Sequence, residues 1–394
     1  MKEGWEYKKL GEVCRIERGG SPRPIKDFIT NSPDGLNWIK IGDTDPQGKY
    51  IYSTKEKIKP EGLRKSRWVE VDEFLLSNSM SFGRPYILKT NGCIHDGWLV
   101  LRDYQKSLII DYFYYLLISP HVQNQFRTKA QGSTVSNLNT DRVADVNIAF
   151  PSLSEQQSIV DYLDSAFAKI DAMKANAEKA LGEAKALFQA SLKEMLEPKE
   201  GWEEKRIDEV CSIARGGSPR PIKDYITNDP NGLNWIKIGD TDMGGKYIYS
   251  TKEKIKPEGL KKSRWVEEDE FLLSNSMSFG RPYILKTNGC IHDGWLVLRD
   301  YQKYLDIDFF YYVLSSEFVQ KQFRTKAQGS TVSNLNTDRV ASVTIPVPSL
   351  SEQQSIVATL DSLKSKVDTL QANYDKISQE CDALKQAILR QVFE

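Results

Sequence analysis

The sequence lacks the features that would assign it to a membrane or to an oxidising compartment. No run of eighteen apolar residues occurs in the chain, which excludes a membrane-spanning helix. Residues 1–13 contain no apolar core, so we expect no signal peptide. The five cysteines are an odd number and form no Cys-x-x-Cys pair, as expected of reduced thiols. These absences predict a cytoplasmic protein, and 394 residues are enough for two or more domains with proper cores.

Enzyme signatures are also missing. The chain has no Gly-x-x-x-x-Gly-Lys-Ser/Thr phosphate loop, no Asn-Pro-Pro-Tyr methyltransferase motif, no Phe-x-Gly-x-Gly cofactor loop and no convincing PD-(D/E)xK nuclease motif. Cys93, His95 and Asp96 lie close together, but no second Cys/His pair follows at a zinc-ligand spacing. A hydrogen-bonded loop is therefore favoured there over a metal site. The sequence predicts no catalytic residue, no metal and no cofactor of its own.

Net charge is another missing signal. The chain has 54 Lys and Arg against 54 Asp and Glu, so it lacks the basic excess of many nucleic-acid-binding proteins. The distribution is uneven, however, with net charges of +4 and +1 over residues 1–150 and 198–347, and of −3 and −2 over 151–197 and 348–394. Positive charge in the two larger segments is compatible with nucleic acid binding and does not demonstrate it.

An internal repeat is the strongest feature of the sequence. When the chain is shifted by 197 residues, 129 of the 154 positions in 4–157 are identical to their counterparts in 201–354. A period this long exceeds that of any solenoid and predicts two whole domains, each with its own appendage. We place the domains at 1–150 and 198–347, and the appendages at 151–197 and 348–394.

The two appendages are predicted to be long helices. Residues 154–197 contain no proline and one glycine, and are rich in Ala, Lys, Glu and Leu, which are strong helix formers. Both appendages begin with Pro-Ser-Leu-Ser-Glu-Gln-Gln. In this sequence Ser152 with Glu155, and Ser349 with Glu352, can form a capping box.

A heptad pattern predicts that these helices pair with each other. Apolar residues of the second helix are spaced alternately four and three residues apart, and the same frame in the first helix is richer in alanine. An antiparallel coiled coil is favoured, because the connections can then stay short; a helix packed on its own domain is the alternative. The predicted seam consists of Ile159, Leu163, Ile170, Ala177 and Ala184 in the first helix, and of Ile356, Leu360, Leu363, Val367, Leu370, Ile377 and Leu384 in the second.

Within each large segment the sequence predicts a mostly-β domain. Short apolar and aromatic runs, such as 36–43, 74–79 and 97–102, are separated by Gly, Pro, Asn and Asp, as strands are. One helix is expected over 111–126, split by Pro120. The predicted fold class is therefore α+β: two mostly-β domains in tandem, each followed by a long helix, the two helices forming an antiparallel coiled coil.

Several polar segments of the repeated unit have residue types that suit contact with DNA. Residues 17–27 put two glycines beside Arg, Ser and Lys, which would bring backbone N–H groups and cations close to phosphates. Residues 54–70 are the most basic stretch, and 77–85 and 128–140 are rich in side chains that hydrogen-bond to base edges. Ordinary turns, caps and solvated strand faces are the alternative in each case.

The candidate DNA-binding residues recur in both copies. In the first copy they are Arg18, Ser21, Arg23, Lys26, Lys57, Arg64, Lys65, Asn78, Ser79, Arg84, Lys129, Gln131, Ser133 and Asn137. In the second copy they are Arg215, Ser218, Arg220, Lys223, Lys254, Lys261, Lys262, Asn275, Ser276, Arg281, Lys326, Gln328, Ser330 and Asn334.

The order of landmarks along the chain resembles the DNA-specificity subunit of type I restriction-modification systems. The segments similar to that family's target-recognition domains are GWEYKKLGEV (4–13), ERGGSPRP (17–24), NWIKIGD (37–43), STKEKIKPEGL (53–63), FLLSNSMSFGRPYIL (74–88) and the domain-ending PSLSEQQSIV (151–160). The resemblance covers essentially the whole chain. The chain departs from the family in one respect: members typically carry dissimilar reading domains and similar helices, and here the reverse holds.

The resemblance implies a sequence-specific DNA-recognition subunit without catalytic activity. Each domain would read one half of a bipartite site, and the helices would act as spacers and docking surfaces. The implied partners are double-stranded DNA, two methyltransferase (modification) subunits and restriction/translocase subunits, and S-adenosylmethionine and ATP would bind only to those subunits. Because the two domains are nearly identical, we expect the site to be an interrupted palindrome. The alternatives are a tandem protein-interaction module on a coiled-coil spine without DNA binding, and an enzyme with two copies of one active site.

Overall fold

The computed structural model describes residues 4–46, 48–78, 83–130, 138–242, 244–275, 280–327 and 335–394. The chain divides into two compact units, one formed by Met1–Ala177 with Tyr374–Glu394 and the other by Glu178–Asn373. Each unit therefore contains one domain, the N-terminal half of the helix that follows it, and the C-terminal half of the other copy's helix.

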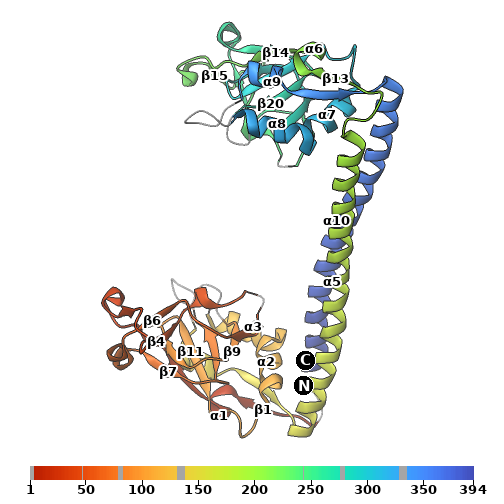
Figure 1. Ribbon diagram of the computed structural model, residues 1–394. Helices are drawn as coiled ribbons and strands as arrows, with labels where there is room; N and C mark the ends of the chain where they lie inside the picture. Colours follow the sequence, from red (N-terminus) through yellow and green to blue (C-terminus); the bar gives the residue numbers. More distant parts are fainter. Residues whose placement is uncertain are drawn as a thin grey trace. The chain divides into compact units, whose positions relative to one another are not determined.

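The first domain consists mainly of short strands, with helices gathered near its end (Figure 1). In chain order its elements are β1 (Glu6–Lys9), α1 (Leu10–Val13), β2 (Arg15–Arg18), η1 (Ile25–Asp27), β3 (Ile29–Thr30), β4 (Leu36–Ile39), η2 (Ile41–Asp43), β5 (Tyr50–Ile51), β6 (Glu56–Ile58), η3 (Pro60–Lys65), β7 (Arg67–Val69), β8 (Phe74–Ser77), β9 (Pro85–Leu88), β10 (Gly92–Ile94), β11 (Trp98–Arg102), α2 (Ile110–Ile118), α3 (Pro120–Ala130), α4 (Thr140–Ala144) and β12 (Asn147–Phe150). The strands expected within 36–43, 74–79 and 97–102 are β4, β8 and β11.

The second domain repeats this order element by element. Its elements are β13 (Glu203–Arg206), α6 (Ile207–Val210), β14 (Ser212–Arg215), η4 (Ile222–Asp224), β15 (Ile226–Thr227), β16 (Leu233–Ile236), η5 (Ile238–Asp240), β17 (Tyr247–Ile248), β18 (Glu253–Ile255), η6 (Pro257–Lys262), β19 (Arg264–Val266), β20 (Phe271–Ser274), β21 (Pro282–Leu285), β22 (Gly289–Ile291), β23 (Trp295–Arg299), α7 (Ile307–Ser315), α8 (Glu317–Ala327), α9 (Thr337–Ala341) and β24 (Thr344–Val347). The long helices are α5 (Leu153–Leu196) and α10 (Leu350–Phe393).

Over the described residues, two five-stranded sheets form the body of the first domain, in the orders β3-β6-β4-β10-β7 and β2-β11-β8-β9-β5. Successive side chains of a strand point to opposite faces of its sheet. In β8, Leu75 therefore lies in the core between the two sheets, whereas Phe74 and Leu76 lie in a second core shared with the helices. Helices α2 and α3 lie beside the sheet that contains β9 and β11 (Figure 1).

The helix expected over 111–126 is split between α2 and α3, but the proline is not the reason. The second domain has Glu317 in place of Pro120 and breaks at the same point, between α7 and α8. In both domains a buried serine caps the second helix: Ser119 Oγ accepts from the N–H of Val122 at 3.4 Å, and Ser316 Oγ from that of Val319 at 3.3 Å. A side-chain cap of this kind satisfies a free N–H group at a helix start.

The two long helices begin at the capping boxes predicted from the sequence. Ser152 Oγ accepts from the N–H of Glu155 at 3.3 Å, and the Glu155 carboxylate accepts from the N–H of Ser152 at 3.1 Å. Ser349 and Glu352 make the same pair of hydrogen bonds. Both predicted helix starts are confirmed.

Within each compact unit, α5 and α10 run antiparallel. In the first unit Asp171 pairs with Lys385, and Lys174, three residues further along α5, pairs at 3.6 Å with Asp382, three residues back in α10. Ile170 of the same stretch lies against Cys381. In the second unit Lys185 donates to Gln371, and Leu192 shares a core with Leu360, so α10 numbers fall as α5 numbers rise. The two helices also close the domain cores, with Leu389, Val392 and Phe393 in the first and Leu192 and Leu196 in the second.

One predicted seam residue is wrong. Leu384 is 47% exposed, and the buried side of α10 continues from Cys381 to Lys385 and Leu389 instead. Lys385 takes the expected place: its ammonium lies 5.2 Å from the centre of the Phe167 ring and pairs with Asp171, so a charged residue occupies a seam position that hydropathy alone assigns to Leu384. Among the other seam residues, Leu163, Ile170, Leu360 and Val367 are buried, and Ile159, Ala177, Ala184, Ile356, Leu363, Leu370 and Ile377 are partly buried.

Two further findings concern composition. All five cysteines are buried and free of disulfides. Among the helices that the structure describes, none combines the length and the hydropathy that a membrane span requires.

Candidate DNA-binding surface

In the first domain, the loop after β10 draws four candidate residues together around Asp96. The Asp96 carboxylate accepts from Ser21 Oγ at 2.7 Å and from Arg23 Nη2 at 3.2 Å. Its backbone oxygen accepts from Arg18 Nε at 3.2 Å and from Asn78 Nδ2 at 2.8 Å. The Ser21 hydrogen bond is the main reason why the pKa of Asp96 is lowered, so this carboxylate is charged at neutral pH.

The two glycines of this loop serve close packing, and the expectation that they expose N–H groups to phosphates is wrong. The N–H of Gly19 donates to Trp98 O at 2.9 Å and that of Gly20 to Ile94 O at 3.1 Å. A Cβ atom on Gly19 would lie 2.1 Å from His95 O. Only glycine permits this approach of one backbone to another, which brings Ser21 and Arg23 within reach of Asp96.

Five cations gather along the loop and the two short helices next to it. We call Arg18, Arg23, Lys26, Arg64 and Lys65 the basic face of the first domain; all five are exposed. Lys26 belongs to η1, and Arg64 and Lys65 end η3. The two helices lie together, since a Cβ on Gly62 would contact Phe28 and Pro22, and Lys65 Nζ is 5.9 Å from the centre of the Phe28 ring. An exposed group of Arg and Lys of this kind suits phosphate contact.

A cleft of about 940 Å³ opens beside the basic face. Its lining includes Arg23, Lys26 and Lys40, together with the indole of Trp38 and the ring of His95. Burial lowers the pKa of His95, and its Nδ1 accepts from the N–H of Gly97 at 2.8 Å, so the imidazole is neutral. The cleft thus combines two aromatic residues with three cations, of which Lys40 pairs with Glu56 of the same lining at 2.7 Å.

The Cys-Ile-His-Asp segment is built into the fold. Cys93 is buried against Trp38 and Ile58, and burial raises the pKa of its thiol to about 11. In the described part of the chain, no three His, Cys, Asp or Glu side chains gather as a metal site would require. What this segment contributes is Asp96, which organises the loop.

Asn78 does not belong to the exposed surface, and its assignment as a base-reading residue is wrong for this conformation. Its side chain is 1% exposed and donates to Asp96 O. Its backbone N–H donates to Gly97 O, and its carbonyl accepts from the N–H of Leu138. Asn275 is buried in the same way in the second domain. These asparagines hold the Asp96 and Asp293 loops in position.

Other candidate residues lie away from the basic face or have partners of their own. Lys57 Nζ donates to Pro33 O at 3.1 Å, Lys129 pairs with Asp145, and the Arg84 guanidinium lies 5.5 Å from the centre of the Tyr86 ring. The remaining candidates fall outside the described residues: Ser79, Gln131, Ser133, Asn137, Ser276, Gln328, Ser330 and Asn334.

The second domain repeats the surface, with Lys261 in place of Arg64. Ser218 and Arg220 donate to the Asp293 carboxylate at 2.7 and 3.2 Å, and Arg215 donates to its backbone oxygen at 3.2 Å. The basic face of this domain consists of Arg215, Arg220, Lys223, Lys261 and Lys262.

The outlying candidates of the second domain follow the first with one exception. Lys254 donates to Pro230 O at 2.7 Å, and the Arg281 guanidinium lies 5.4 Å from the Tyr283 ring centre. Lys326 stands where Lys129 does, but Ser342 replaces Asp145, so that ion pair is not repeated.

Comparison with known proteins gives a consistent result. The family model described as "Type I restriction modification DNA specificity domain" matches the chain twice, over residues 2–181 and 199–379. The chain is 21% identical to the EcoBI specificity subunit of Escherichia coli over 422 residues, covering 100% of this chain and 86% of that protein. It is 22% identical to the MjaVIII specificity subunit of Methanocaldococcus jannaschii, over 96% of this chain and 90% of that protein.

Two solved structures share the fold. A chain from a study of complex assembly and conformational transition of the type I R-M system superimposes with a TM-score of 0.76 at 21% identity, covering 99% of this chain and 97% of that one. The HsdS subunit from Thermoanaerobacter tengcongensis gives a TM-score of 0.62 at 22% identity, covering 100% and 97%.

Proposed function

Because the chain belongs to the family of type I restriction-modification DNA specificity domains, we propose that its two domains read the same half-sequence of a bipartite DNA site. The observation that carries this proposal is the recurrence of one polar surface at a shift of 197 residues. Arg18, Ser21 and Arg23 around Asp96 correspond to Arg215, Ser218 and Arg220 around Asp293, with equal distances. Two surfaces with the same side chains in the same arrangement recognise the same bases and phosphates.

The proposed division of the chain follows from this role. Residues 1–150 and 198–347 are the reading domains, and residues 151–197 and 348–394 are the spacer helices. Identical readers related by a two-fold axis would meet the same half-sequence on opposite strands, so the proposed site is an interrupted palindrome.

The chain in this proposal specifies the site and leaves the chemistry to its partners. Those partners are two modification subunits, which methylate DNA with S-adenosylmethionine, and restriction subunits that hydrolyse ATP. The similar chain with a TM-score of 0.76 comes from work on the assembly of a type I complex, which supports a role within a complex. The chain's net charge of zero supports the same view, because weak DNA affinity of the isolated chain would require such partners.

Mapping of methylated bases across a host genome tests the proposal. We expect one motif with two identical halves in inverted orientation, separated by a gap of fixed length. A motif with two unrelated halves would contradict identical reading by the two domains. Unchanged methylation after deletion of the gene would contradict the role in modification altogether and favour a protein-interaction module without DNA binding.

A further inference from the structure

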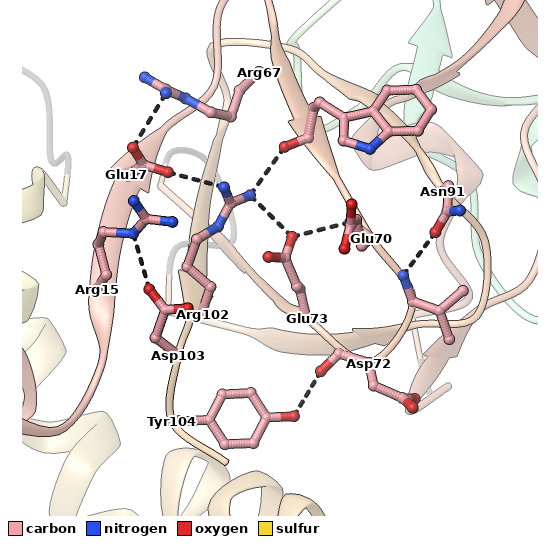
Figure 2. Close-up of polar contacts among 12 residues, drawn as sticks. Arg15, Glu17, Arg67, Glu70, Asp72, Glu73, Asn91, Arg102, Asp103 and Tyr104 are labelled. Atoms are coloured by element: carbon pink, nitrogen blue, oxygen red, sulfur yellow. Dashed lines mark hydrogen bonds and ion pairs between the residues drawn. The ribbon is translucent and has the colours of Figure 1, made fainter. Parts of the chain in front are cut away.

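The first domain holds an arginine beside its basic face in a network of ion pairs (Figure 2). Glu17 of β2 lies between two guanidinium groups. Its Oε1 accepts from Arg67 Nη1 at 3.1 Å, and its Oε2 lies 3.1 Å from Arg102 Nη1 in an ion pair without hydrogen-bond geometry. Arg102 Nη2 in turn donates to Glu73 at 2.9 Å and to Trp68 O at 2.9 Å. Two cations and two carboxylates thus neutralise each other.

The second domain lacks the central carboxylate of this network. Ala214 stands where Glu17 does, while Arg264, Arg299 and Glu270 are retained. Arg299 keeps its pair with Glu270 at 2.9 Å, but the residues that the structure describes place no carboxylate in an ion pair with Arg264. The group therefore changes from neutral to a net charge of +1, with two arginines against one glutamate.

The loss of Glu17 also opens the structure around the retained arginines. Arg67 is partly buried in the first domain, whereas its counterpart Arg264 is exposed. The exposed fraction of the side chain rises from 14% for Arg102 to 29% for Arg299. The same fold thus leaves both arginines more exposed in the second domain than in the first, and Arg264 is free of the carboxylate that holds Arg67.

This guanidinium lies at the edge of the basic face. Arg264 Nε donates to Arg215 O at 2.6 Å, as Arg67 Nε does to Arg18 O at 3.3 Å. Arg18 and Arg215 are the residues from which the glycine loops start. In both domains the guanidinium is therefore held next to the cations that the proposed function assigns to DNA.

A second charge difference lies at the other end of β2. Arg15, which pairs with Asp103 at 3.1 Å in the first domain, is replaced by Ser212, whose Oγ donates to Asp300 at 2.6 Å. The Arg15 position is three residues, about 10 Å along a strand, from the start of the glycine loop. The two replacements together move positive charge along the strand toward the basic face.

We propose that Arg264 is a phosphate contact of the second domain, and that Glu17 withholds the equivalent contact, Arg67, in the first. The proposal rests on the proposed function. An arginine free of carboxylates binds a phosphate through two parallel N–H groups, whereas one held by Glu17 must first give up an ion pair. The two domains therefore read the same half-sequence but hold it with unequal strength, and the second domain is the stronger.

Exchange of the residues at positions 17 and 214 tests the proposal. Both Glu and Ala occur at this position in one of two nearly identical domains, so we expect either domain to tolerate either residue. The variants are Glu17→Ala, Ala214→Glu and the two together, in the full-length chain within its assembled complex. The measurement is the salt dependence of binding to random-sequence duplex DNA, because a phosphate contact is independent of base sequence. Thermal unfolding of each variant gives the control for stability.

We expect the slope of log K against log salt concentration to steepen by about 0.9 in E17A and to become shallower by about 0.9 in A214E. The double exchange should restore the wild-type slope. Adding Arg67→Ala to E17A should abolish the gain, which a general loosening of the domain would not predict.

Three results would overturn the proposal. If the wild type and all variants bind DNA with the same slope of log K against log salt concentration, Arg264 does not contact DNA. The proposed function would remain intact. A steeper slope that survives Arg67→Ala would show that Glu17 repels DNA directly. Absence of DNA binding by every protein, wild type included, would contradict the proposed function itself.

Discussion

At the scale of single residues, Asp96 and Asp293 connect the fold to the surface proposed to bind DNA. Each carboxylate accepts from a serine and an arginine of the glycine loop, and each backbone oxygen accepts from a further arginine and a buried asparagine. The carboxylate therefore fixes the loop while it partly neutralises Arg23 or Arg220. A fixed loop loses less conformational entropy when DNA binds.

Replacement of both carboxylates, Asp96→Asn with Asp293→Asn, should destabilise the protein in a pH-dependent way. The pKa of each aspartate is lowered in the folded state, chiefly by the serine hydrogen bond. The stabilisation is therefore present above the unfolded pKa, about 4, and is lost as pH falls through the folded pKa. Because the side chains are 43% exposed, we expect about 1 kcal/mol or less per domain at pH 7.

Chemical unfolding of the wild type and the variant between pH 7 and pH 3 measures this effect. The difference in unfolding free energy should be constant above about pH 5 and shrink below about pH 4. A difference that persists unchanged at the acid end would show that the charge of these carboxylates has no part in stability.

The glycine loop gives a second prediction, with a control glycine in the same domain. Gly19→Ala would place a Cβ atom 2.1 Å from His95 O, whereas a Cβ on Gly42 meets no atom within 4 Å. We expect Gly19→Ala to lower the unfolding free energy by about 1–3 kcal/mol and to weaken DNA binding. Gly42→Ala should change stability by less than about 0.5 kcal/mol. Equal effects of the two substitutions on both measurements would argue against close packing at Gly19.

The surface could be predicted from the sequence only in part. Residue type and repetition indicated Arg18, Ser21 and Arg23, but nothing in the local pattern separates a buried asparagine from an exposed one. The residue type of Asn78 favours base reading, but its side chain is buried and donates to Asp96 O, and its backbone bonds to Gly97 and Leu138. The local sequence around Asp96 shows only a nearby cysteine and histidine. Its role depends on residues 75 positions away in the sequence, which periodicity cannot reveal.

At the scale of elements, local signals were reliable where they acted over one or two turns. The capping boxes at Ser152 and Ser349 determine where the long helices begin, and both follow from neighbouring residues. The break between α2 and α3 was expected for the wrong reason, because a serine cap outweighs the proline. The prediction for Leu384 is wrong because a helix seam is defined by its partner: the ammonium of Lys385 lies over the Phe167 ring and pairs with Asp171, and Leu384 is left exposed.

Two leucines six residues apart in α5 test the position of the seam. Leu181 is 6% exposed, and Leu187 is 59% exposed. We expect Leu181→Ala to cost about 2 kcal/mol or more of unfolding free energy, because it leaves a cavity among buried side chains. Leu187→Ala, the matched control, should change it by less than about 0.5 kcal/mol. Thermal or chemical unfolding of the two variants decides the matter, and a larger loss at Leu187 would place the seam on the other side of the helix.

At the scale of the whole chain, the repeat and the compact units do not coincide. The domains repeat every 197 residues, yet each unit includes the C-terminal turns of the helix that belongs to the other copy. Phe393 packs against Tyr112 with ring centres 5.7 Å apart, and Leu192 and Leu196 enter the core of the second domain. Neither copy has a complete core without the other's helix.

The proposed spacer role predicts that helix length sets the gap in the DNA site. The contact of Ile170 with Cys381 places Ala177 opposite Tyr374, seven residues further along α5 and seven residues back in α10. One heptad inserted after Ala177 and one before Tyr374 keep the seam in register and lengthen the pair by about 10 Å, or about three base pairs of DNA. Mapping of methylated bases in cells that carry this variant should show the same half-sequences separated by a gap about three base pairs longer. A heptad inserted in α5 alone is the control: it leaves the helices unequal, so we expect a less stable protein and no efficiently methylated site. An unchanged gap in the paired variant would mean that something other than the helix pair, such as the partner subunits, determines the spacing.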